Sequence, residues 1–132
     1  VRPVEKPDTI VRSLSFGSPA DGGYAIRQAN ESGAAILSVP DEATIDSIRL
    51  LAETEGILTE TAGGVTLAAL RRAVDEGRLQ RHEETVLVIT GNGLKTLDVL
   101  AGDDARTLPE PIAPSFDAFE EWWGNTAGEA AA

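Results

Sequence analysis

The sequence contains no cysteine and no methionine, and His82 is its only histidine. The absence of cysteine excludes disulfides, thiolate catalysis and cysteine-ligated zinc sites. A metal hydrolase or a serine hydrolase would have to use His82, which lies in a polar connector after Arg81 and is expected to be solvated. Because the chain opens at Val1, the missing methionine indicates either a GTG start codon or a longer natural chain.

Basic residues are scarce, with 11 Lys and Arg against 22 Asp and Glu, which gives a net charge of −11. Such a chain has no broad positive field, so nucleic acid and membrane surfaces are not expected partners. No apolar run approaches the roughly 20 residues that a membrane span needs, and no signal core is present. The expected location is cytoplasmic. A length of 132 residues with 42% hydrophobic residues suits one globular domain.

The hydrophobic pattern alternates between helix and strand. Apolar residues recur at helical spacing in residues 24–32, 42–55 and 65–76. Short runs typical of strands lie at 35–39, 57–59 and 85–90. Strands joined by helices of this length predict an α/β fold, a mostly parallel sheet with helices on both faces.

The end of the chain differs in composition from the rest. From Asp98 onward there are eight acidic residues and one basic residue, with prolines at 109, 111 and 114. Phe116, Phe119 and Trp123 have helical spacing. The predicted organisation is an α/β body at 1–98, a linker at 99–114, a helix at 115–124 and a disordered tail at 125–132.

Three loops combine hydroxyl side chains with glycine, at 13–19, 60–64 and 90–93. In an open parallel sheet, ligands bind at the loops that follow the carboxyl ends of the strands. These loops are therefore candidate ligand loops, although glycines can also serve only to close turns. No phosphate-loop or dinucleotide-binding fingerprint is present.

Three segments resemble a known family. They are residues 9–22, residues 50–65 with the motif Glu60-Thr61-Ala62-Gly63-Gly64, and residues 88–95 with the motif Thr90-Gly91-Asn92-Gly93-Leu94-Lys95. Together they look like the closing third of threonine synthase, over about residues 7–98. The resemblance implies part of a pyridoxal-phosphate fold-type II large domain, as in the tryptophan synthase β subunit. It also implies conversion of O-phosphohomoserine and water to threonine and phosphate. Serine and threonine dehydratases have a similar plan and remain an alternative.

The resemblance also implies which residues form one wall of the pyridoxal-phosphate site. Thr90 matches the hydroxyl residue that partners the pyridine nitrogen, and a neutral hydroxyl leaves that nitrogen largely unprotonated. The other implied cofactor-binding residues are Gly91, Asn92, Glu60 and Ala62, with Ser15 and Gly17 as additional candidates. No catalytic residue and no metal ligand is assigned.

Two requirements of the family are missing from the chain. The Schiff-base lysine has no counterpart, because Lys6 lies in a proline-flanked start and Lys95 follows a turn, where it is expected to be solvated or paired with a carboxylate. The loop that holds the cofactor phosphate is also absent. The chain alone is therefore expected to be inert and to need the rest of a longer chain. A free-standing, non-catalytic interaction module is the second hypothesis.

Two expectations concern the surface. The arginines at 71, 72, 78 and 81 are expected to pair with nearby carboxylates rather than to form a basic binding face. Exposed sheet edges are expected to cause aggregation or formation of a homodimer.

Overall fold

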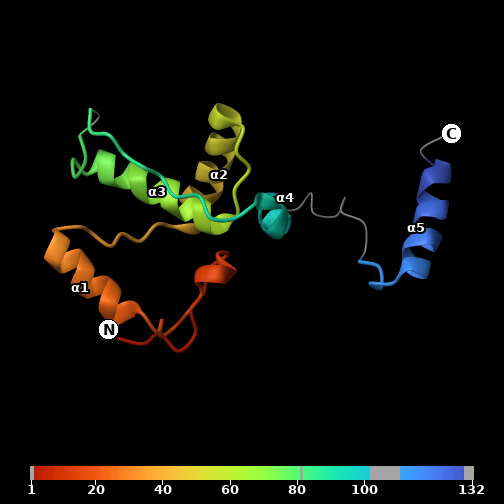
Figure 1. Ribbon diagram of the computed structural model, residues 1–132, viewed down its shortest axis with the longest axis horizontal. Coiled ribbons are helices and arrows are strands. Elements are labelled where there is room, and N and C mark those ends of the chain that lie inside the picture. Colours follow the sequence, from red (N-terminus) through yellow and green to blue (C-terminus); the bar gives the residue numbers. More distant parts are fainter. Residues whose placement is uncertain (1, 81, 102–110, 130–132) are drawn as a thin grey trace. The chain divides into compact units, whose positions relative to one another are not determined.

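The computed structural model describes residues 2–80, 82–101 and 111–129. The chain divides into two units, Val1–Gly102 and Asp103–Ala132, each described here by itself. The first unit contains the 3-10 helix η1 (Arg12–Leu14), the helices α1 (Gly22–Ser32), α2 (Asp41–Glu55) and α3 (Thr61–Asp75), the 3-10 helix η2 (Gly93–Thr96) and the short helix α4 (Leu97–Ala101) (Figure 1). The second unit contains α5 (Phe116–Glu129). None of the described helices is long and apolar enough to cross a bilayer.

Helices α2 and α3 form the main packing contact of the first unit. Ile48 on α2 is fully buried, and Leu51 and Ala68 are nearly so. The helices approach closely at Gly64, where a Cβ would lie 2.7 Å from the Ile48 side chain and 2.8 Å from the Thr44 carbonyl oxygen. Only glycine allows this approach without moving one helix.

The helix ends follow the sequence signals. Gly33 and Gly56 end α1 and α2 in the left-handed conformation, with φ of 71° and 67°. Asp41 is the first residue of α2. Its carboxylate accepts hydrogen bonds from the Thr9 hydroxyl (2.6 Å) and the Ile10 amide (3.0 Å), so it fastens the N-terminal segment to α2.

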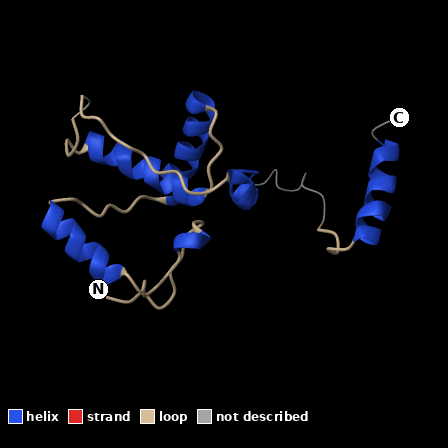
Figure 2. Ribbon diagram, in the orientation of Figure 1, coloured by secondary structure: helices blue, strands red, loops and turns tan. Residues whose placement is uncertain are grey.

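The predicted parallel sheet is wrong for the described residues. Figure 2 shows helices and loops there, and the segments expected as strands at 35–39, 57–59 and 85–90 are extended loops. Their one ladder contact is an isolated antiparallel bridge between Thr59 and Asn92. A strand pattern predicts extended backbone but does not supply the neighbour that must hydrogen-bond with it. Ile36, Val86 and Val88 are accordingly more than 60% exposed.

The start of α3 also differs from the prediction. The helix begins at Thr61, four residues before the expected start at 65, so the Thr61–Gly64 stretch is helical rather than a loop. In the second unit, α5 covers residues 116–124 of the helix expected at 115–124 and continues to Glu129, into the segment expected to be disordered. Of the linker expected at 99–114, residues 99–101 belong to α4, and residues 102–110 lie outside the described residues, as do 130–132.

Candidate functional site

Two segments that are more than 30 residues apart in sequence join beside the start of α3. The Glu60 amide donates to the Gly91 carbonyl oxygen (3.1 Å), and the Gly93 amide donates to the Leu58 carbonyl oxygen (3.0 Å). These two bonds flank the Thr59–Asn92 bridge. In Figure 1 the chain that leads into α4 can be followed past the beginning of α3. We call this arrangement of residues 58–60 and 91–93 the junction.

Thr59 holds the junction from the inside. It is fully buried, and its hydroxyl lies 3.2 Å from the Gly91 carbonyl oxygen and 3.3 Å from that of Glu60. Gly63, in the first turn of α3, packs directly on Thr59, and a Cβ there would overlap the Thr59 hydroxyl. The glycine of the Glu-Thr-Ala-Gly motif therefore has a packing role.

Glu60 precedes α3 and covers Gly91. Its backbone carbonyl accepts the amides of Gly63 (3.0 Å) and Gly64 (3.2 Å), which starts the helix. Its side chain is only 12% exposed and occupies the space where a Cβ of Gly91 would lie. The Lys95 ammonium lies 3.4 Å from Glu60 Oε2. Lys95 is thus paired with a carboxylate, one of the two environments expected for it.

Asn92 turns the chain into η2. Its side-chain oxygen accepts the Leu94 amide at 2.9 Å, which is the usual way in which asparagine caps a helix start. This cap places Lys95 within η2, on the side from which its ammonium reaches Glu60.

The structure thus brings together three of the five predicted cofactor-binding residues, Glu60, Gly91 and Asn92. Ala62 is half-buried in the first turn of α3, two residues from Glu60. Thr90 precedes Gly91 and is exposed, and no hydrogen bond to its hydroxyl comes from the described part of the chain. No described residue therefore competes with a ligand for its hydroxyl.

The two additional candidates belong to a separate turn near the N-terminus. The Val4 amide donates to the Gly17 carbonyl oxygen at 2.8 Å, and the Ser15 hydroxyl lies 3.5 Å from the Pro7 carbonyl oxygen. Across the described ranges, no hydrogen bond joins either residue to the junction.

The sequence analysis missed Thr59 and the partner of Lys95. Thr59 was expected only as the end of a strand, and no local pattern reveals that its hydroxyl reaches residue 91. Lys95 follows the capping residue Asn92 by three positions. This spacing is the sequence signal that could have placed Lys95 in the short helix η2.

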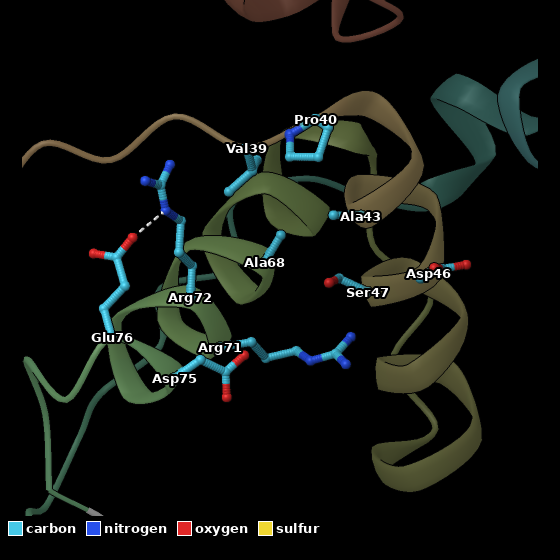
Figure 3. Close-up of a pocket in the computed structure, with 10 residues that line it drawn as sticks. All are labelled: Val39, Pro40, Ala43, Asp46, Ser47, Ala68, Arg71, Arg72, Asp75 and Glu76. Carbon is cyan, nitrogen blue, oxygen red and sulfur yellow. Dashed lines mark hydrogen bonds and ion pairs between the residues drawn. The ribbon is translucent and has the colours of Figure 1, made fainter.

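A pocket of about 400 Å³ lies between α2 and α3, away from the predicted site residues (Figure 3). Ser47 and Ala68 line it together with Arg71 and Arg72. Arg72 is already engaged, because it binds Glu76 (2.6 Å) and the Ser38 carbonyl oxygen (2.6 Å). The Ser47 hydroxyl is buried and has no hydrogen-bond partner among the described residues.

The charged groups at the end of α3 form a local network. Arg72 and Arg78 both bind Glu76 at 2.6 Å, which confirms that these two arginines pair with a carboxylate. The hydrogen bond from Arg78, and after it that from Arg72, lowers the pKa of Glu76 below its ordinary value of 4.5. Arg81 lies outside the described residues.

His82 is exposed, and the described residues hold no cluster of side chains suited to a metal ion.

Comparison with known proteins decides the family. The model of the family described as "Pyridoxal-phosphate dependent enzyme" matches residues 1–91. The chain belongs to this pyridoxal-phosphate-dependent enzyme family. Threonine synthase of Bacillus sp. (strain ULM1) is 38% identical over 96 residues, which are 73% of this chain and 27% of that protein. Threonine synthase of Mycobacterium tuberculosis (strain H37Rv) is 34% identical over 112 residues, 85% of this chain and 31% of that protein.

A third relative matches a larger share of the chain. Threonine synthase of Methanosarcina acetivorans is 32% identical over 121 residues, 92% of this chain and 29% of that protein. The resemblance to threonine synthase is thus confirmed, and pyridoxal phosphate is the cofactor that the family implies. The chain spans about three tenths of the length of these relatives.

The residues present fit one end of this cofactor. The Thr90 hydroxyl lies beside the junction without a partner among the described residues, and a hydroxyl is a suitable hydrogen-bond partner for a ring nitrogen. The sequence does not supply the lysine and the phosphate-binding loop that the rest of the cofactor needs. The sequence has two lysines, and Lys95 is paired with Glu60 while Lys6 lies in the proline-flanked start.

Proposed function

We propose that this chain is the carboxyl-terminal part of a threonine synthase and forms one wall of its pyridoxal-phosphate site. The proposed reaction converts O-phosphohomoserine and water to threonine and phosphate. The observation that carries the proposal is the junction, where the two motifs that resemble threonine synthase are hydrogen-bonded to each other, and where no other described residue binds the Thr90 hydroxyl. Identity of 32–38% to threonine synthases supports it.

Pyridoxal phosphate supplies the electron sink that stabilises negative charge on the substrate carbon. In the proposed site the Thr90 hydroxyl binds the ring nitrogen. A neutral hydroxyl does not stabilise a protonated ring nitrogen, so the ring is a moderate electron sink, whereas the carboxylate of an aspartate would favour the protonated ring. Thr59 and the two backbone bonds of the junction hold Gly91, and therefore its neighbour Thr90, in place.

The lysine that binds the cofactor and the loop that binds its phosphate are proposed to lie in a part of the natural protein outside these 132 residues. The substrate is accordingly proposed to bind between this wall and that other part. The isolated chain is then a site component without activity of its own.

The experiment is to express the natural reading frame that contains this chain and to assay the product with O-phosphohomoserine and pyridoxal phosphate. We expect equimolar release of phosphate and threonine. A serine or threonine dehydratase would instead release ammonia and a keto acid from serine or threonine. A frame that encodes only these residues and binds no cofactor would support the non-catalytic module.

A further inference from the structure

The Lys95–Glu60 ion pair is the one charged contact that the described residues make across the junction. We propose that Lys95 is a positioning residue for the cofactor wall: by holding the Glu60 carboxylate over Gly91, it fixes the turn that carries Thr90. This inference rests on the proposed function for its catalytic consequence, but its structural content can be tested separately.

The pair connects the two halves of the junction in addition to their backbone bonds. Lys95 belongs to η2, which continues from Asn92, whereas Glu60 precedes α3. The Lys95 amide also bonds back to the Asn92 carbonyl oxygen at 3.3 Å, so the lysine backbone is tied to the turn itself. The position of the Lys95 side chain is therefore coupled to the backbone of residues 91 and 92.

The two partners are placed very unequally. The Glu60 side chain is 12% exposed, whereas that of Lys95 is 66% exposed. A carboxylate that has lost most of its water is costly unless a cation or hydrogen bonds compensate it. Lys95 is its sole ion-pair partner in the described ranges. Without Lys95 we expect the carboxylate to turn outward to water and to leave the space above Gly91.

Gly91 makes the turn at residues 90–92 sensitive to the position of the Glu60 side chain. Because it has no Cβ, the Glu60 side chain can lie there, and the three heavy atoms nearest to the position of a Cβ all belong to Glu60. An outward movement of Glu60 would give residues 90–92 freedom that the two backbone bonds alone do not remove. Thr90 would then meet the ring nitrogen in a broader range of positions, and small displacements of such groups lower turnover.

The structural part is tested by amide hydrogen exchange on the protein expressed from the natural reading frame. The reporters are the Glu60 amide, bonded to Gly91, and the Gly93 amide, bonded to Leu58. Lys95→Met should speed exchange at both amides, and Lys95→Arg should restore wild-type exchange. Arg78→Met is the matched control, since it removes another exposed cation with a carboxylate partner but lies away from the junction. Exchange in Lys95→Met equal to that of wild type would overturn the proposal.

The catalytic part is tested in the protein expressed from the natural reading frame. Lys95→Met should lower kcat about two- to fivefold, the range expected for loss of one partly exposed ion pair. KM for O-phosphohomoserine should stay within about a factor of two, because a positioning residue does not bind the substrate. Lys95→Arg should restore kcat.

A double-mutant cycle with Glu60→Gln tests whether Lys95 acts through Glu60. If Lys95 acts through Glu60, Lys95→Met should add nothing to the effect of Glu60→Gln. Additive effects would show that Lys95 acts independently of Glu60, and a large rise in KM would show that it acts on substrate binding. Either result would overturn the positioning role. A protein without synthase activity would refute the proposed function while leaving the exchange result to decide on the ion pair.

Discussion

Thr90 owes its proposed role to what surrounds it rather than to its own contacts. Its hydroxyl has no partner within the described residues, yet the next residue, Gly91, accepts bonds from Glu60 and from Thr59. A free polar group on a fixed backbone is the arrangement that ligand recognition needs, because the backbone does not have to be ordered when the ligand arrives.

Replacement of Thr90 by valine tests this group. In the natural full-length protein, Thr90→Val should keep the side-chain volume and remove the hydrogen bond to the ring nitrogen. Loss of one such bond costs about 1–3 kcal/mol, so turnover should fall roughly ten- to a hundredfold. Cofactor affinity should fall less, and Thr90→Ser should retain most of the turnover. Steady-state kinetics of both variants provide the measurement. Wild-type turnover in Thr90→Val would contradict the proposed role.

Gly63 is a residue whose identity is set by packing. Gly63→Ala would place a Cβ into the buried Thr59 side chain, and overpacking of this kind costs about 1–3 kcal/mol. The gain in helix propensity from alanine, about 1 kcal/mol, offsets only part of that. Urea unfolding should therefore show a lower midpoint than for wild type. Gly23→Ala is the control, because nothing lies within 4 Å of its Cβ in α1, and it should raise the midpoint. Equal behaviour of the two variants would contradict the packing role.

At the scale of elements, the sequence predicted helices better than their surroundings. Residues 24–32 and 42–55 lie in α1 and α2, since helix periodicity and a terminal glycine are local signals. The start of α3 was misplaced because Thr-Ala-Gly-Gly is typical of a turn. Gly63 and Gly64 instead permit contacts with Thr59 and with α2, and those contacts are invisible in the local pattern.

The predicted sheet was wrong because the sequence signal for a strand is local. Pairing of strands depends on neighbours far along the chain, and alternation in residues 35–39 or 85–90 gives no information on them. The motifs, in contrast, linked Glu60 with Gly91 and Asn92 through a resemblance to whole proteins, and the structure joins these residues by hydrogen bonds. Their contact with a cofactor stays a prediction.

The end of α3 should respond to acid. The pKa of Glu76 is lower in the folded chain, because Arg78 and Arg72 stabilise the carboxylate. Its contribution to stability is therefore present above the ordinary value of 4.5 and is lost as the pH falls through the lower, folded-state value. Glu76→Gln should flatten this part of the pH dependence, followed by circular dichroism during thermal unfolding. An unchanged slope in Glu76→Gln would show that the network does not act on stability.

At the scale of the whole molecule, the first unit exposes several large apolar side chains. Phe16, Ile36, Val86 and Val88 are each more than 60% exposed. Apolar surface of this kind favours association, even against a net charge of −11. Sedimentation of the 132-residue chain should show dimers or larger species. A monomer with one cooperative unfolding transition would favour the free-standing module.

The central claim is that this chain forms a wall of a pyridoxal-phosphate site and does not supply the lysine. Borohydride reduction of the natural full-length protein with pyridoxal phosphate, followed by peptide mapping, tests it most directly. The account predicts one stoichiometric adduct on a lysine outside these 132 residues, and no stoichiometric adduct on the isolated chain. A stoichiometric adduct on Lys95 or Lys6 would contradict it.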